Sequence, residues 1–363
     1  MFVRFVLRVV TTLLLALAAA ALCVLLKTPL PWMIGPLLAT AAASMAGLRT
    51  ASAVPLRNAG QWTIGAALGL YFTPQVTALV AGLWWAIAIG IVWALAMGAL
   101  FGAWLGRANR VRLAHLPPPM LRATTYFAGT IGGASEMTLL SERAGARTDL
   151  VASSHSLRVL IVTLLVPFGM QWAGLHGLDP MPPVLRQVDP AGLAMLVAAT
   201  GAGALVMRRL GRANPWFIGA LLVSAGLTAA GSVLSAIPQG LSNTAQLAIG
   251  VSLGVRFTPG FMRTAPRWLA TVGAGTVAMV AICAGFAWLL AQATGLPWPT
   301  LVLGTSPGGI AEMSITAKVL QLGVPVVTAF QVCRLVAVLV LAEPLFRVLE
   351  RRRGRAGNDN ATA

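Results

Sequence analysis

The amino-acid sequence predicts an all-α polytopic membrane protein made of two inverted repeats, each with about five crossings and one glycine-rich re-entrant or broken helix. The first observation behind this prediction is composition: 58% of the residues are hydrophobic and only 10% are charged, which is outside the range of soluble domains. A helix needs about 20 apolar residues to cross a bilayer. Seven segments without Asp, Glu, Lys or Arg are near or above that length, namely 9–26, 28–48, 58–106, 159–178, 190–207, 213–255 and 268–311.

The second observation is an internal duplication. The segment PWMIGPLL at 31–38 returns as PWFIGALL at 215–222, and QWTIGAALGLYFTP at 61–74 returns as QLAIGVSLGVRFTP at 246–259. Repetition of several anchors in one order identifies one structural unit written twice. Other matched positions are Glu136 with Glu312 and Arg158 with Arg334.

The duplication divides the chain into four segments. We expect a first membrane repeat over 1–178, a Pro-rich linker over 179–189 and a second membrane repeat over 190–350. The basic tail, 351–363, is expected to be disordered because it is polar and rich in arginine.

The third observation is the distribution of positive charge. If both glycine-rich regions span the bilayer, the Lys and Arg residues of the loops divide about 14 to 10 between its two sides. If both regions enter and leave on one side, 21 of the 26 Lys and Arg residues lie on the cytoplasmic side and three on the other. The positive-inside rule favours the second arrangement. Five crossings per half then insert the halves in opposite orientations, with both termini cytoplasmic in a bacterial inner membrane.

The glycine-rich regions read GTIGGASEM at 129–137 and TSPGGIAEM at 305–313. Glycine pairs allow a break in a helix, and proline strengthens it. Broken helices expose backbone dipoles that hold ions or substrate groups. The candidate binding residues of these regions are Gly132, Gly133, Gly308 and Gly309, with the hydroxyls of Thr130, Ser135, Thr305 and Ser306.

Four ionisable residues lie within apolar segments, and such residues are functional candidates in a membrane protein. Glu136 and Glu312 are candidates for binding a coupling H⁺ or Na⁺, and Arg158 and Arg334 for holding a substrate carboxylate. The structural alternative is that each Glu pairs with the Arg of its own half. Further candidates are Gln61 and Gln246, for which helix–helix hydrogen bonding is the alternative, and His155 with its counterpart Gln331, where a packing role is the alternative.

Several other features point to packing or exclude a class of function. Gly65, Gly69, Gly250 and Gly254 recur at four-residue spacing, which is typical of close helix packing. No clustered metal ligands or nucleotide-binding loop occur, so we expect no metal, no cofactor and no enzymatic activity. The net charge of +17 comes from basic residues in the short loops between apolar segments, and this distribution predicts no nucleic-acid partner. Lipid is the expected environment, and the Trp-rich segments 78–105 and 268–292 could serve homodimer contacts.

The PW-x-IG motif, the Q-x-x-IG-x-x-LG-x-x-FTP helix and GG-x-x-EM together resemble the AbrB-type membrane protein family, over about residues 10–350. The resemblance implies a distant relation to the inverted-repeat cation/proton antiporters and anion transporters. Members of the family carry labels of ammonia monooxygenase and of a regulator of gene expression, and the residues support neither chemistry.

The sequence therefore predicts a secondary transporter that moves a small organic solute, preferentially an anion, by alternating access coupled to H⁺ or Na⁺. Two alternatives stay open. One is a monovalent cation/proton antiporter in which the arginines only neutralise charge. The other is a membrane regulator of gene expression that transports nothing.

Overall fold

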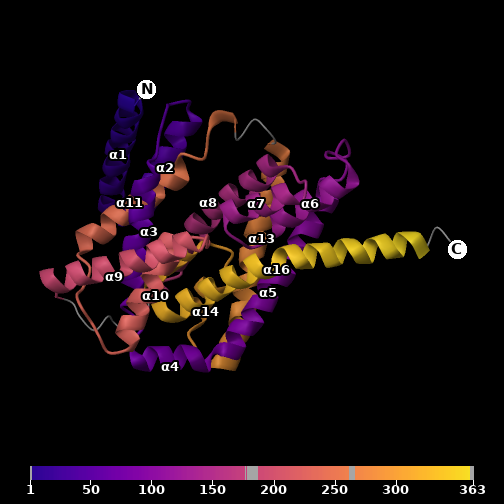
Figure 1. Ribbon diagram of the computed structural model, residues 1–363. Helices are drawn as coiled ribbons and strands as arrows, with labels where there is room; N and C mark the ends of the chain where they lie inside the picture. Colours follow the sequence, from indigo (N-terminus) through magenta and orange to yellow (C-terminus); the bar gives the residue numbers. More distant parts are fainter. Residues whose placement is uncertain (1, 176, 178–186, 261–265, 360–363) are drawn as a thin grey trace.

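The computed structural model describes residues 2–175, 177, 187–260 and 266–359, which form helices joined by loops and contain no strand (Figure 1). This confirms the all-α prediction. The first half contains α1 (Phe2–Leu25), α2 (Pro31–Met45), α3 (Val54–Gly69), α4 (Pro74–Gly82), α5 (Trp84–Ala108), α6 (Pro118–Gly129), α7 (Ala134–Arg143) and α8 (Thr148–Trp172). The second half contains α9 (Pro190–Arg209), α10 (Pro215–Ala229), α11 (Gln239–Gly254), α13 (Pro266–Thr294), α14 (Trp298–Thr305), α15 (Ile310–Leu320) and α16 (Val324–Asp359).

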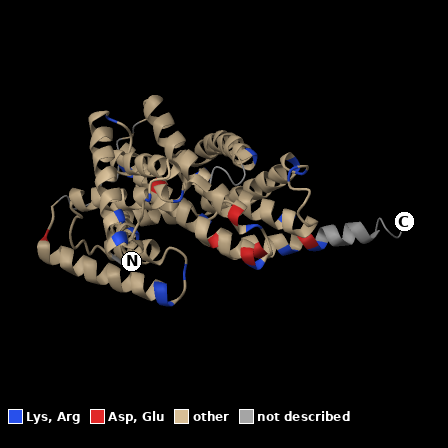
Figure 2. Cartoon of the chain, turned by 90° about the horizontal axis from the view of Figure 1, so that it is seen from above, with Lys and Arg blue, Asp and Glu red and all other residues tan. Residues whose placement is uncertain are grey.

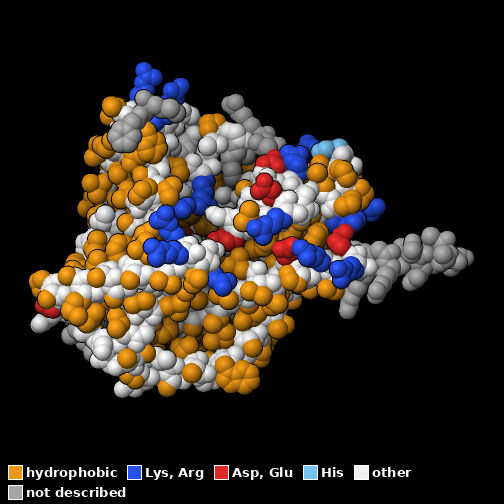
Figure 3. Space-filling model, in the orientation of Figure 1, with side chains coloured by type: hydrophobic (Ala, Val, Ile, Leu, Met, Phe, Trp, Pro, Cys, Tyr) orange, Lys and Arg blue, Asp and Glu red, His pale blue; other side chains and the backbone are white. Residues whose placement is uncertain are grey.

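Among the described residues, six helices are long and apolar enough to cross a membrane: α1, α5, α8, α9, α13 and α16. Helices α3 and α4 form one further apolar pair, bent by 92°. Few charged residues interrupt the chain (Figure 2), and hydrophobic side chains cover much of the surface (Figure 3). The protein is therefore a multi-pass membrane protein.

Local sequence signals set the ends of the repeated helices. Helices α2 and α10 both begin with proline, whose fixed φ and missing N–H suit the first turn. Both are followed by a glycine with positive φ, Gly47 at +87° and Gly231 at +79°. Glycine adopts this conformation without steric cost, so the matched glycines end matched helices.

The two halves pack against each other through two equivalent helix pairs. Helix α3 of the first half packs along α10 of the second, and α11 of the second packs along α2 of the first. A Cβ on Gly250 would lie 2.5 Å from the carbonyl oxygen of Met33, and one on Gly254 would lie 2.7 Å from the Cβ of Thr40. Gly65 and Gly69 make the matching close contacts with Phe217 and Ser224 in the other pair. The predicted packing role of these four glycines is confirmed.

One pair of corresponding helices, α5 and α13, runs antiparallel. Trp93 of α5 stacks on Phe286 of α13 with ring centroids 4.2 Å apart. Farther along α5, Phe101 and Trp104 lie against Gly275, which comes earlier in α13. The antiparallel arrangement is what an inverted repeat requires, while the orientation of each half in a membrane stays a prediction. The Trp-rich segments thus pack within one chain, and their use in a homodimer is likewise still a prediction.

Each glycine-rich region folds as a hairpin of two short helices. The chain turns between α6 and α7, and the start of α8 returns to the level of α6, where the Arg147 N–H donates to Thr124 Oγ1 at 2.9 Å. The second half repeats this return, because Gly323 lies beside Thr300, the counterpart of Thr124. Both regions therefore fold back on themselves, and their re-entrant course in a membrane stays a prediction.

The linker and the tail are only partly described. Residues 179–186 of the predicted linker lie outside the described residues. Asp189 caps α9 by accepting from the N–H of Gly192 at 2.6 Å. In the tail, α16 continues through 351–359, where the sequence predicts disorder. Residues 360–363 are outside the description.

Replacing Gly250 by alanine should destabilise the protein by about 1–3 kcal/mol, because the added methyl group meets the backbone of α2. The matched control is Gly226→Ala in α10, where nothing lies within 4 Å of the new methyl group; this change should stabilise its helix by about 0.5–1 kcal/mol. Thermal unfolding of purified protein in detergent measures both. Equal melting temperatures for the two variants would contradict the reciprocal packing.

Candidate functional site

The tips of the two hairpins meet in a cavity of about 400 Å³, the central cavity. Its walls come from both halves: the start of α3, the tip between α6 and α7, α8, the loop before α10, the end of α11, the tip between α14 and α15, and α16. Figure 3 shows basic and acidic side chains gathered around a hollow in the middle of one face. The central cavity therefore brings together elements that are far apart in the sequence.

Two buried arginines hold the broken helices. Arg158 is 2% and Arg334 6% exposed. Arg158 Nη1 donates to the carbonyl oxygen of Thr130 at 2.8 Å, and Arg334 Nη1 donates to that of Ser306, the matching residue, at 2.6 Å. The Nη2 atoms donate to further carbonyls of the tips, those of Ala128 and Gly129 in the first half and Gly308 in the second.

These contacts explain why the arginines can be buried. The last carbonyls of a helix lack partners within it and carry the negative end of its dipole. A guanidinium group supplies both donors and positive charge to them, so that burial does not leave the charge unsatisfied. One N–H, on Nε, has no partner in either residue. This N–H is buried in both residues and is unpaired among the described residues.

His155 and Gln331 perform the same packing task in the two halves. His155 Nε2 lies 2.9 Å from the Phe127 carbonyl oxygen, and Gln331 Nε2 donates to the Leu303 carbonyl at 2.6 Å. Gln331 Oε1 also accepts from Arg334 Nη2 at 2.5 Å. These bonds support the packing interpretation of the pair, although His155 also lines the central cavity.

The GG-x-x-EM motif is a packing unit in both halves. A Cβ on Gly308 would lie 2.8 Å from Met313 Cγ, and one on Gly309 would collide with the carboxylate of Glu312. Gly132 and Gly133 have the same relation to Met137 and Glu136. The first glycine thus makes room for the methionine and the second for the glutamate, so that the carboxylate folds over the start of its helix, where the dipole favours negative charge.

Neither glutamate forms an ion pair with an arginine among the described residues, whose ion pairs are Arg122–Glu350, Arg147–Asp149 and Arg347–Glu343. The structural alternative of a Glu–Arg pair within each half is therefore wrong for this structure, because the arginines bind backbone carbonyls instead. Both carboxylates line the central cavity. Glu312 is 7% exposed, whereas Glu136 is half-buried, so the first hairpin is the more accessible one.

The remaining predicted residues divide into cavity-lining and structural ones. Ser135 and Gln61 line the central cavity, and Gln61 Nε2 lies 3.5 Å from Asn214 Oδ1. Gln246 is buried outside its lining. The hydroxyls of Thr130, Thr305 and Ser306 bond to carbonyls four residues earlier in their own helices, at 2.9, 2.8 and 2.5 Å.

Sequence reasoning missed several residues of the central cavity. Arg57 and Arg256 are half-buried in its wall, and Arg212 is exposed there. Trp216 also lines the cavity, and its ring lies 6.0 Å from that of Trp62. The sequence does contain a signal for these arginines, because none of them is matched by a basic residue in the other half. Their counterparts are, in order, Ser242, Thr28 and Tyr71.

The fold and the cavity define a class, a multi-pass helical membrane protein with an internal duplication and two broken-helix hairpins that meet at its centre. Within this class the chain belongs to the AbrB family, since the family model described as "Transition state regulatory protein AbrB" matches residues 32–350. The family resemblance seen in the sequence is thereby confirmed.

Two relatives cover most of this chain. It is similar to the uncharacterized protein YhjN of Bacillus subtilis (strain 168), with 24% identity over 312 residues, which cover 81% of this chain and 79% of that protein. It is also similar to a protein of Escherichia coli (strain K12) named as a candidate regulator, AbrB, with 27% identity over 328 residues, which cover 88% of this chain and 90% of that protein.

Replacing Arg334 by methionine should cost about 2–4 kcal/mol of stability, because the carbonyls of Ser306 and Gly308 lose their buried donors. The matched control is Arg347→Met, which removes an ion pair whose arginine is 68% exposed and should cost less than about 1 kcal/mol. The melting temperatures of the two variants in detergent provide the comparison. A stable Arg334→Met protein would show that the carbonyl contacts do not support the hairpin.

Proposed function

We propose that this protein is a secondary transporter that moves a small organic anion across the bacterial inner membrane by alternating access, coupled to H⁺ or Na⁺. One observation carries the proposal: two re-entrant hairpins, each with a carboxylate at the start of its second helix, meet in one polar cavity inside an apolar helical protein. Irregular backbone at membrane depth is tolerated where it is buried in protein or lines a watery cavity, and transporters bind their substrates where such helices meet.

The carboxylates support the coupling role. Glu136 and Glu312 line the cavity without an arginine partner within 4.0 Å among the described residues. Each can therefore accept a proton, or ligate Na⁺ with nearby backbone groups, without first breaking an ion pair. A binding site with ionisable groups of this kind is typical of coupled transport.

The charge of the cavity supports an anionic substrate. Five arginines line it (Arg57, Arg158, Arg212, Arg256 and Arg334) against two glutamates. Even with both carboxylates ionised, the cavity keeps a net positive charge, which attracts anionic solutes. This balance disfavours the alternative of a cation/proton antiporter.

The difference between the two hairpins supports alternating access. Their sequences and contacts match, yet the first tip is open to solvent and the second is nearly closed. The less buried arginines, Arg57, Arg212 and Arg256, lie on the open side, which the positive-inside rule assigns to the cytoplasm, together with both termini. If the second tip became exposed and the first became buried, the cavity would open to the opposite side of the membrane.

The proposal is tested by solute flux in proteoliposomes with imposed H⁺ and Na⁺ gradients, using wild type, Glu136→Gln and Glu312→Gln. Gradient-driven uptake of an organic acid should fall at least about tenfold in both variants, because glutamine keeps the shape but cannot exchange a charge. Glu343→Gln is the matched control, since Glu343 pairs with Arg347 outside the cavity.

Flux that survives in both variants would remove the carboxylates from the coupling mechanism. If wild type moves no solute and no ion, transport is excluded. A membrane regulator without transport activity, as the family description and the name of the Escherichia coli relative suggest, would then be the better proposal.

A further inference from the structure

A second cavity of about 660 Å³ adjoins the central cavity on the side of the first hairpin. We call it the outer vestibule. It lies between the hairpin, the start of α8 and the segment after α11, and it shares Ala134, Ser135 and Arg256 with the lining of the central cavity. A solute that moves between the two spaces therefore passes these three residues.

Arg256 is the only charged residue of the three, and it is not paired. Its side chain makes no hydrogen bond or ion pair with another described residue, although it is half-buried. Burial and the charge of Arg57 lower the pKa of Arg256, and the charges of Glu312 and Glu136 raise it. The guanidinium group is thus within the electrostatic reach of both hairpin carboxylates, and none of its donors is paired with a described residue.

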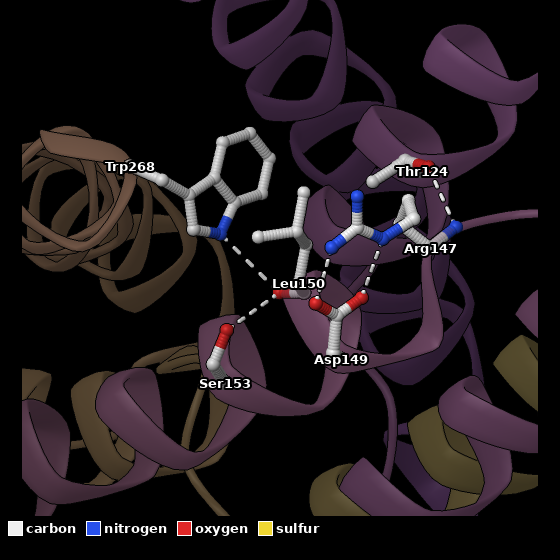
Figure 4. A network of polar contacts seen from close by, with 6 residues as sticks. All are labelled: Thr124, Arg147, Asp149, Leu150, Ser153 and Trp268. Atoms are coloured by element: carbon white, nitrogen blue, oxygen red, sulfur yellow. Dashed lines mark hydrogen bonds and ion pairs between the residues drawn. The ribbon is translucent and has the colours of Figure 1, made fainter. Parts of the chain in front are cut away.

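The other charged group of the vestibule wall is already neutralised. Figure 4 shows that Asp149 accepts two hydrogen bonds from Arg147, at 2.9 and 2.7 Å. In the same network, Ser153 Oγ and Trp268 Nε1 both donate to the Leu150 carbonyl, at 3.0 and 3.2 Å. This network fixes the wall and leaves Arg256 as the unbalanced charge among the vestibule residues that the structure describes.

Three hydroxyl groups of the vestibule remain available to a solute. The side chains of Ser135, Ser156 and Thr258 line it and make no hydrogen bond with another described residue. Hydroxyls can donate to and accept from a hydroxyl of a ligand. The vestibule thus combines one cationic donor group with neutral partners for hydroxyl groups.

Most of the corresponding positions of the other half lack this chemistry, although Thr258 corresponds to Thr73. Arg256 corresponds to Tyr71, and Ser156 to Val332. Asp149 and Ser153 correspond to Pro325 and Ala329. The vestibule is therefore an addition to the duplicated scaffold and not a consequence of the duplication.

We infer that Arg256 is the substrate-recognising residue at the passage between the outer vestibule and the central cavity, and that it selects small organic acids that carry hydroxyl groups. This inference rests on the proposed transport function and specifies its substrate class. The solute carboxylate takes bidentate hydrogen bonds from the Arg256 guanidinium, and its hydroxyl groups meet the serine and threonine side chains. Arg158 and Arg334, whose Nη atoms are occupied by backbone carbonyls, position the hairpins.

Binding can be tested without transport, by thermal stabilisation of the purified protein in detergent. The probes are malate, succinate, which lacks the hydroxyl group of malate, and glycerol and choline as neutral and cationic controls. Saturable binding of malate should raise the melting temperature of wild type. Its half-maximal concentration should rise at least about tenfold in Arg256→Gln and less in Arg256→Lys, because a lysine keeps the charge but not the bidentate geometry.

A second variant tests the hydroxyl contacts independently of charge. Ser156→Ala should reduce the preference for malate over succinate, while Arg347→Gln, outside both cavities, should leave both acids unchanged. Equal malate binding in wild type and Arg256→Gln would overturn the role of Arg256, and so would stabilisation by choline or glycerol in place of the acids. If acids bind as expected but none is transported, the inference holds for binding and the transport proposal fails; if a neutral or cationic solute is transported and no acid binds, transport holds and the inference fails.

Discussion

The structure depends on one interaction made twice, the contact between a buried guanidinium group and the carbonyl end of a broken helix. A helix that stops inside a membrane protein leaves unpaired carbonyls, each of which costs free energy in an apolar medium. Arg158 and Arg334 satisfy these carbonyls from neighbouring helices and oppose the helix dipoles. Without the two arginines, the hairpin tips could not meet at the centre of the protein.

This arrangement separates the scaffold from the binding groups. An arginine paired with a glutamate would neutralise the only acids of the central cavity. Because the arginines bind backbone instead, Glu136 and Glu312 stay available, and each is held over its own helix by a glycine that has no Cβ to displace it. The positive charge that faces solutes then comes from the half-buried Arg57 and Arg256.

Much of this architecture could be predicted from the sequence, and the two main failures have different causes. Hydropathy predicts the all-α membrane class and the repeated motifs predict the order of the matched segments, while the charge distribution predicts a re-entrant course for 129–147. The partners of Arg158 could not be predicted, because every residue has a carbonyl and only tertiary structure shows which are unpaired. Arg256 was missed for another reason. It corresponds to Tyr71 in the first half, and the repeated motifs indicate only those residues that both halves share.

The packing of helices from one half against helices of the other has a consequence for the order of folding during synthesis. Helix α2 meets its partner α11 only after the whole first half and the first part of the second half have been made, so the surface of α2 stays uncovered until a distant segment is synthesised. The first half should therefore occupy the membrane as an unfinished intermediate that needs the second half, or a helper protein, to cover it. Two halves encoded as separate chains would have to associate after insertion in opposite orientations. In a single chain, the covalent linkage keeps the two halves together.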